Sequence, residues 1–366
     1  MSRLISIGTA VPQHRTTQDT ILEFMHAAYH NDVASRKLNV LFTNSGIEKR
    51  YSALPDFDKN RNEHIFFNGV PSTATIERKM DVFKEEAVPL AMDAIHNAFE
   101  KINTTIADFN ITHLITVSCT GLFSPGLDAV LMKELQLPSA IFHTSVNFIG
   151  CNAAFHALKI ADLILKADQN AHVLVVCVEL CTLHFQPKNN HDNLLSNTIF
   201  GDGAAAVILT SEKQAQVNQY KGLSIKGFYS LLLNEGKELM GWNITALNFE
   251  MVLNAAIPGF IGDKLQTILQ QACKHYSISE KSISKWAIHP GGKRILDTVK
   301  SELKLKEEQI QASYDVLKEF GNMSSPTILF VLNELLQASA EKTEQIFAMG
   351  FGPGLSIETA MFAHAD

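Results

Sequence analysis

Apolar and polar positions along this chain follow two different periods, which predict strands and helices in alternation. Short apolar runs bounded by glycine or proline predict buried strands at 4–8, 113–121, 140–146, 172–180, 199–209 and 286–292. Apolar residues at helical spacing predict helices at 18–29, 77–101, 127–135 and 295–303, and 249–276 is predicted as a strand, a proline turn and a helix. Residues 52–72 and 186–193 are predicted as polar loops, and 211–245 as irregular apart from a strand near 223–229. This alternation indicates a layered α/β fold.

The same units recur at an offset of 171 residues (322 − 151), although few residues match. At this offset, residues 115–121 align with 286–292, and the turn Gly150–Cys151 aligns with Gly321–Asn322. This register predicts two pseudo-symmetric halves, 1–222 and 223–366, whose helix starts face each other across a pseudo-twofold axis.

The stretch from Phe148 to Leu165 joins a glycine turn, Cys151 and a helical pattern of apolar residues. No proline or glycine interrupts the pattern after Cys151, so the cysteine is expected in the first turn of a buried helix. Free backbone N–H groups and the positive end of the helix dipole would favour a thiolate there. Buried cysteines are common, so on this stretch alone a structural role is the stronger alternative.

Two further residues would meet Cys151 if the halves face each other, namely His289 and Asn322. A thiol nucleophile needs a base or cation, and acyl transfer or decarboxylation needs donors aimed at a developing oxyanion. Taken singly, His289 could be a turn residue, Asn322 a helix N-cap and Asp202 an ordinary turn aspartate. The prediction of a catalytic site therefore depends on Cys151, His289 and Asn322 together.

Composition narrows the functional class. A chain of 366 residues with 46% apolar and 19% charged residues is typical of a globular enzyme. Its net charge of −7 argues against nucleic acid as a partner, and an anionic substrate would need a local basic patch. A small basic cluster (Arg36, Lys37, Lys49, Arg50) is expected on a solvated face.

Cysteine usage and the apolar runs indicate a compartment. The chain has five cysteines in no CxxC pair, so neither a disulfide framework nor a metal site is expected. No stretch resembles a signal peptide or a membrane span. We therefore expect a cytoplasmic protein.

Five motifs, in order, resemble those of the type III polyketide synthases, the chalcone synthase-like enzymes. They are GCNAA (150–154), IFGDGAAAVIL (199–209), HPGGKRILD (289–297), GNMSSPTILFVL (321–332) and GFGPGLSIETAMF (350–362). Weaker similarity extends to IGTAVP (7–12) and SCTGLFSPGLD (118–128). The HPGG sequence, where related ketoacyl synthase III enzymes have an HxAN type, separates the two families.

The resemblance implies a thiolase fold with five layers, αβαβα, in a homodimer with independent active sites. It implies iterative decarboxylative condensation of malonyl-CoA onto an acyl-CoA starter, with no metal, flavin, nicotinamide or carrier protein. Cys151 would be the nucleophile, and His289 and Asn322 would stabilise the enolate. A single-condensation ketoacyl synthase III and a non-catalytic thiolase-fold subunit remain alternatives.

The resemblance also implies the substrate pocket. Phe200 would be one of two gatekeepers. The second position holds Met251, with Phe249 two residues earlier, and either could serve as the gate. Cys119, His184 and Trp242 are further pocket candidates. These apolar or soft groups predict a medium- to long-chain fatty acyl starter and an alkylpyrone or alkylresorcinol product.

Coenzyme A binding departs from the family pattern. Of three basic residues in the plant enzymes, only Lys37 is matched, because Val40 and Asn44 occupy the other two positions. Lys293 and Arg294, at a predicted helix start, are added candidates.

Overall fold

The computed structural model describes residues 1–58, 64–67, 74–246, 248–338 and 344–365. The strands are β1 (Ser2–Ala10), β2 (His14–Thr17), β3 (Lys49–Ser52), β4 (His113–Ser118), β5 (Phe142–Asn147), β6 (His172–Leu180), β7 (Asp202–Ser211), β8 (Gly222–Leu232), β9 (Met240–Ile244), β10 (Phe249–Leu253), β11 (Ile283–Ile288), β12 (Gln345–Gly352) and β13 (Ser356–Ala365). The α-helices are α1 (Gln18–Tyr29), α2 (Asp32–Thr43), α3 (Ile76–Lys101), α4 (Ile106–Phe109), α5 (Leu127–Glu134), α6 (Ala153–Ala167), α7 (His191–Ile199), α8 (Glu212–Val217), α9 (Ile257–Tyr276), α10 (Lys293–Glu302), α11 (Glu307–Phe320) and α12 (Thr327–Gln337). Short 3₁₀ helices are η1 (Pro55–Phe57), η2 (Cys181–His184), η3 (Asn234–Gly236) and η4 (Glu280–Ser282).

Nine strands pair in the order β11-β12-β13-β8-β1-β7-β6-β4-β5. This series contains the same arrangement of four strands twice. In the first half, β4 pairs parallel with β6, β6 antiparallel with β7, and β7 antiparallel with β1. In the second half, β11 pairs parallel with β12, β12 antiparallel with β13, and β13 antiparallel with β8. Two residue pairs between β1 and β8 join the two sets into one series. This order confirms the predicted repeat, and the predicted boundary after residue 222 falls at the start of β8.

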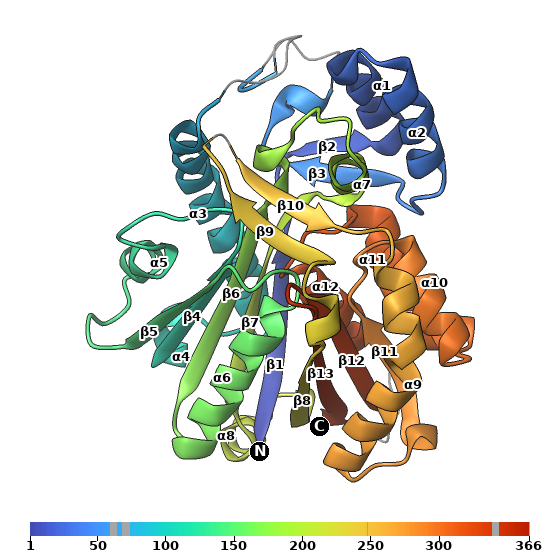
Figure 1. Ribbon diagram of the computed structural model, residues 1–366. Helices are drawn as coiled ribbons and strands as arrows, with labels where there is room; N and C mark the ends of the chain where they lie inside the picture. The colour runs from blue at the N-terminus through green and yellow to red at the C-terminus, as the bar shows by residue number, and fades with distance from the viewer. Residues whose placement is uncertain (59–63, 68–73, 247, 339–343, 366) are drawn as a thin grey trace.

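Three apolar clusters separate the layers. One lies between strands of the first half and α1, α2, α3 and α5; another surrounds α6 and α12, between the strands of both halves; the third lies under α9 and α10. In β6, Leu174 and Val176 face the first cluster while Val173 and Val175 face the central one, because successive side chains point to opposite faces. α3 and the pair α9 and α10 lie on opposite sides of the molecule (Figure 1). The layers follow the expected αβαβα order.

Some predicted loops contain helices. α2 occupies the basic segment, because Ala34, Leu38 and Phe42 recur every four residues and are buried. α7 begins inside the predicted polar loop, and α8 and β9 lie in the stretch predicted as irregular, whereas β8 contains the strand predicted near 223–229. Residues 59–63 and 68–72 of the predicted loop lie outside the described residues. In the described part of the chain, none of the helices has both the length and the apolarity needed to cross a membrane.

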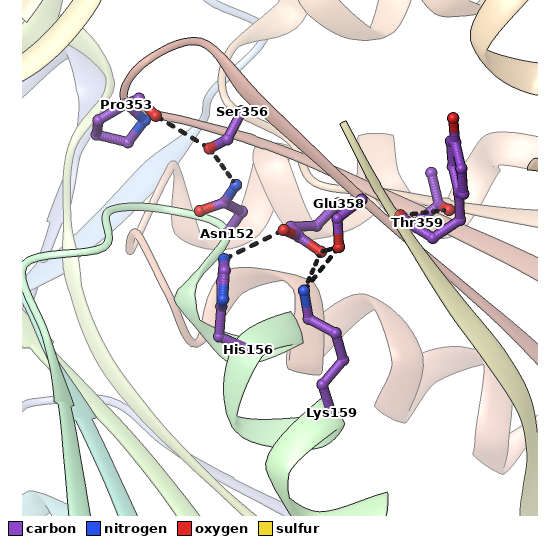
Figure 2. A network of polar contacts seen from close by, with 9 residues as sticks. Asn152, His156, Lys159, Pro353, Ser356, Glu358 and Thr359 are labelled. Atoms are coloured by element: carbon purple, nitrogen blue, oxygen red, sulfur yellow. Dashed lines mark hydrogen bonds and ion pairs between the residues drawn. The ribbon is translucent and has the colours of Figure 1, made fainter. Parts of the chain in front are cut away.

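A polar network around the buried carboxylate of Glu358 fixes α6 against the second half of the fold (Figure 2). His156 and Lys159 on α6 contact the Glu358 carboxylate on β13, at 3.2 and 2.6 Å. At the start of α6, the amide of Asn152 donates to the hydroxyl of Ser356, at 2.8 Å. Because Cys151 immediately precedes Asn152, this network holds the predicted nucleophile in position relative to the other half.

Glu358 gives this network a defined pH dependence. Burial alone would raise the pKa of Glu358, but hydrogen bonds from His156, Lys159 and Ser230 outweigh burial and lower it. A carboxylate whose pKa is lower when folded stabilises the fold above its unfolded pKa of about 4.3, and this contribution is lost as the pH falls through the folded pKa.

We expect Glu358→Gln to lower the free energy of unfolding by about 2 kcal/mol at pH 7, because it removes charge-assisted hydrogen bonds. The deficit should be smaller at pH 4, because the contribution of the carboxylate begins to fall once the pH drops below its unfolded pKa of about 4.3. Urea unfolding at both pH values measures this. Glu308→Gln, in an exposed pair with Lys306, is the control and should change stability little. An equal deficit at both pH values would contradict the electrostatic role.

Candidate active site

A tight turn places Cys151 just before the N-terminal end of α6. Gly150 has φ +95°, and a Cβ atom there would lie 2.3 Å from Cδ of Pro353, in the β12–β13 turn. Only glycine therefore permits this approach between the two halves. Cys151 was predicted in the first helical turn. The helix instead begins at Ala153, so Cys151 lies just before the N-cap Asn152. The N–H of Ala153 closes the turn by donating to the carbonyl of Gly150, at 3.0 Å.

Asn322 is placed by its backbone. Its N–H donates to the carbonyl of Ile199 and its carbonyl accepts from the N–H of Gly201, at 2.9 and 3.0 Å. The side-chain Oδ1 accepts from the N–H of Ser324 at 2.8 Å, which turns Nδ2 toward Sγ of Cys151, 4.0 Å away. The amide thus presents donors, not an acceptor, to the sulfur.

His289 follows β11, and its N–H donates to the carbonyl of Met349 at 2.8 Å. The imidazole is 1% exposed, and neither ring nitrogen has a hydrogen-bond partner among the described residues. Cys151, His289 and Asn322 all line one cavity of about 290 Å³. The structure therefore brings the three predicted catalytic residues together, with the imidazole nitrogens available to a bound molecule.

Burial disfavours the thiolate of Cys151 and the imidazolium of His289 when either forms alone. It raises the pKa of Cys151 to about 11 and lowers the pKa of His289 to about 3. The nearby side chains of Ser324 and Asn322 act in the opposite direction on Cys151 and favour its thiolate. Transfer of the thiol proton to His289 would leave the cavity without net charge. Such a transfer avoids the larger cost of one unpaired buried charge.

Glu179 is a buried carboxylate beside the nucleophile that the sequence analysis missed. Its oxygens accept from the N–H of Cys119 (2.9 Å) and the hydroxyls of Thr120 (2.7 Å) and Ser325 (2.6 Å). Burial raises its pKa, and its charge would oppose ionisation of Cys151. A glutamate inside the otherwise apolar run 172–180 was the available signal.

A second, smaller chamber of about 50 Å³ adjoins the cavity. Phe200 and Met251 line both spaces, whereas Phe249 lines only the smaller one. Met251 is therefore the better placed of the two gate candidates. His184 and Trp242 also line the smaller chamber, as expected of pocket residues. His184 bonds the carbonyl of Thr120 at 2.7 Å and stacks on Phe249 with ring centroids 4.5 Å apart.

Cys119 is the one pocket candidate that lines neither space. Its sulfur accepts from the N–H of Gly150 at 3.0 Å, which turns the thiol beneath the nucleophile turn, and the residue is fully buried. Cys119 therefore lies against the nucleophile turn, and its role as a pocket residue stays a prediction.

The basic residues divide into two groups. Lys293 and Arg294 line the cavity at the start of α10, together with His191, which the sequence analysis did not single out. Lys37 is exposed on α2, one helical turn before the cavity residues Val40 and Leu41. Arg50 contradicts its prediction as a solvated residue, since it is 5% exposed and lines the smaller chamber.

Comparison with known proteins decides the family. Residues 1–213 match the family description "Chalcone and stilbene synthases, N-terminal domain", and residues 229–365 match the corresponding C-terminal domain. The chain belongs to the chalcone and stilbene synthases, the type III polyketide synthases. Like other members of this family, it is an acyltransferase-type enzyme with a thiolase fold.

Two curated type III polyketide synthase relatives illustrate the match. "Alpha-pyrone synthesis polyketide synthase-like Pks18" of Mycobacterium tuberculosis is 31% identical over 293 residues, 79% of this chain and 74% of the relative. The "3,5-dihydroxyphenylacetyl-CoA synthase" of Streptomyces toyocaensis is 28% identical over 98% of this chain and 89% of the relative.

Solved type III polyketide synthase structures extend the match to the whole fold. PKS-I from the brown alga Ectocarpus siliculosus superposes with a TM-score of 0.90 at 28% identity, covering 100% of this chain and 98% of that one. The C-terminal type III domain of Steely1 from Dictyostelium gives a TM-score of 0.89 at 25% identity, covering 100% and 99%.

Proposed function

We propose that this type III polyketide synthase loads an acyl-CoA starter onto Cys151 and extends it with malonyl-CoA. The observation that carries the proposal is the shared cavity of Cys151, His289 and Asn322, in a chain that matches the family over residues 1–213 and 229–365. The chemistry uses coenzyme A thioesters and calls for no metal or redox cofactor.

Loading begins when His289 takes the thiol proton of Cys151 and the sulfur attacks the starter thioester. The carbonyl collapses back to a thioester on Cys151, and the departing coenzyme A sulfur takes the proton from His289. The buried, unbonded imidazole suits this role, because its neutral form is favoured and its nitrogens are free to exchange a proton.

Extension needs donors at the malonyl thioester oxygen. Loss of carbon dioxide leaves an electron pair that forms an enolate, and His289 and the Nδ2 of Asn322 would donate hydrogen bonds to its oxygen. The enolate carbon then attacks the acyl group on Cys151, and the extended chain passes to coenzyme A. The fixed amide of Asn322 supports this role, since a pre-oriented donor needs no reorganisation during the reaction.

We propose a medium- to long-chain fatty acyl starter and an alkylpyrone or alkylresorcinol product. Support comes from the mainly apolar lining of the large cavity, which includes Leu195, Ile199, Met240, Leu253, Ile257 and Phe351. Each buried methylene contributes about 0.8 kcal/mol, so such a lining favours longer alkyl chains. The name of the alpha-pyrone-forming relative agrees with a pyrone product.

Coenzyme A would enter at α10, where Lys293 and Arg294 can meet its phosphates beside a helix N-terminus, with Lys37 nearby on α2.

We also propose a homodimer. β5 is an exposed strand at the end of the nine-stranded series, and Phe142 on it is 75% exposed. The five free cysteines suit a reducing compartment such as the cytoplasm.

Loading and decarboxylation should separate by mutation. Cys151→Ala should abolish acylation by starter, whereas Asn322→Ala should retain acylation and lose about 10²–10³-fold in malonyl-CoA decarboxylation. Intact-protein mass and release of labelled carbon dioxide measure the two steps. Cys273→Ala, a free thiol that lines neither chamber, is the control. Acylation of Cys151→Ala, or full decarboxylation by Asn322→Ala, would remove that residue from the mechanism.

The starter proposal predicts that kcat/KM rises from hexanoyl- to longer acyl-CoA starters and exceeds that for p-coumaroyl-CoA. Products formed with labelled malonyl-CoA should be identified by mass, which also counts the malonyl units added. Met251→Trp should shorten the preferred starter, because Met251 borders both chambers. A flat series or a preferred aromatic starter would defeat the proposal, and one malonyl unit per product would favour a ketoacyl synthase III reaction.

A further inference from the structure

The C-terminal end of α7 is capped by two side chains from other elements. A helix leaves its last carbonyls without partners inside the helix. Here Nη1 of Arg50 donates to the carbonyls of Asn197 and Phe200, at 3.0 and 2.5 Å. The amide of Gln18 donates to the carbonyl of Thr198 at 2.9 Å. Arg50, from β3, and Gln18, from α1, therefore hold this helix end together.

The last residue of α7, Ile199, places the proposed enolate donor. Its carbonyl accepts from the N–H of Asn322 at 2.9 Å, and the N–H of Gly201 donates to the carbonyl of Asn322 at 3.0 Å. One helix end thus presents both the carbonyls that Arg50 binds and the carbonyl that binds Asn322. Nδ2 of Asn322 lies 4.0 Å from Sγ of Cys151, so a shift of this helix end would move the donor relative to the sulfur.

Arg50 also packs against the segment that leads into Asn322. A Cβ atom at Gly321 would lie 3.0 Å from both Cγ and Cδ of Arg50 and 2.7 Å from the carbonyl oxygen of Ile199. Gly321 has φ +68°, in the left-handed region that favours glycine. The glycine therefore lets both the arginine stem and the end of α7 contact the backbone beside Asn322.

The guanidinium keeps its charge in this buried position. Burial lowers the pKa of Arg50 to about 9, while the charge of Asp202 opposes this shift, so the group is charged at neutral pH. The negative end of the α7 dipole lies at the carbonyls that Arg50 binds and favours the same charge. Nε of Arg50 donates to Oε1 of Gln18 at 3.0 Å, so the planar fork joins the second capping residue to α7 in a fixed geometry.

We propose that Arg50 is a positioning residue for Asn322: it holds the C-terminal end of α7 so that the amide of Asn322 faces Cys151. This inference rests on the proposed function, which assigns decarboxylation of malonyl-CoA to Asn322. Arg50 acts through the backbone of residues 199–201. Its loss should therefore affect decarboxylation more than acylation of Cys151, because a separate turn fixes the thiol.

Arg50→Lys tests this role, because lysine keeps the positive charge but lacks the planar fork that reaches two carbonyls. Gln18→Met is a second, milder variant, which removes the neighbouring cap and keeps a side chain of similar length. Both substitutions are also made in the Asn322→Ala background. Malonyl-CoA decarboxylation, acylation of Cys151 and the pH dependence of its alkylation by iodoacetamide are measured in every protein.

Arg3→Lys is the matched control. Arg3 is also a buried arginine, and it binds the carbonyl of Tyr220 and the carboxylate of Glu212, but it lines neither chamber. Thermal unfolding of all variants measures the stability lost, so the control shows what the loss of a buried guanidinium does to the fold alone. Its decarboxylation rate should equal that of the wild type.

In the presence of Asn322, Arg50→Lys should lower decarboxylation about 10- to 100-fold, because a small displacement of a donor is costly. Gln18→Met should lower it about three- to tenfold, and acylation of Cys151 should change less than about threefold in both. In the Asn322→Ala background, neither substitution should lower decarboxylation further by more than about twofold, because residues that act through one contact are not additive.

The inference would be overturned if the folded variants decarboxylate at the wild-type rate, or if they lower the rate equally with and without Asn322. If Arg50→Lys does not fold, Gln18→Met decides between these results. If Asn322→Ala itself decarboxylates at the wild-type rate, the proposed function fails. The alkylation profile then tests positioning alone: Asn322 favours the thiolate of Cys151, so its displacement should move alkylation to higher pH, and an unchanged profile would contradict the inference.

Discussion

The site depends on one contact between residues that are 171 positions apart, the approach of Nδ2 of Asn322 to Sγ of Cys151. Two backbone constraints produce it. Gly150 allows the nucleophile turn to pack against Pro353 of the second half, and the pairing of Asn322 with Ile199 and Gly201 fixes the segment that precedes α12. Behind them, the network around Glu358 holds α6 against β13, so the geometry is set by packing between the two halves.

Burial then sets the chemistry. The cavity makes a lone thiolate or a lone imidazolium costly, yet both imidazole nitrogens have no partner among the residues that the structure describes. A proton that moves from Cys151 to His289 satisfies both conditions, because charges appear only as a pair. Asn322 and Ser324 stabilise the sulfur side of that pair. We therefore propose a proton transfer that occurs within the cavity and not with solvent.

The periodicity of the sequence could predict the layers and the repeat, because apolar spacing reports burial directly. It could also predict Cys151, His289 and Asn322 as a set, since the repeat register implies that the helix starts meet. It could not predict that Arg50 is buried or that Cys119 bonds the nucleophile turn. Both depend on partners distant in sequence: the carbonyls of Asn197 and Phe200 for Arg50, and the N–H of Gly150 for Cys119. A local pattern contains no information about such partners.

The most direct test of the central claim is the pH dependence of alkylation of Cys151 by iodoacetamide in the wild type and in His289→Ala. If His289 accepts the thiol proton, the wild-type thiolate should form at least one pH unit below that of His289→Ala. Without the imidazole, burial alone should keep the thiol protonated until the pH approaches its raised pKa of about 11. Site-resolved mass spectrometry follows Cys151 apart from the other four thiols. Superimposable profiles for the two proteins would contradict the account.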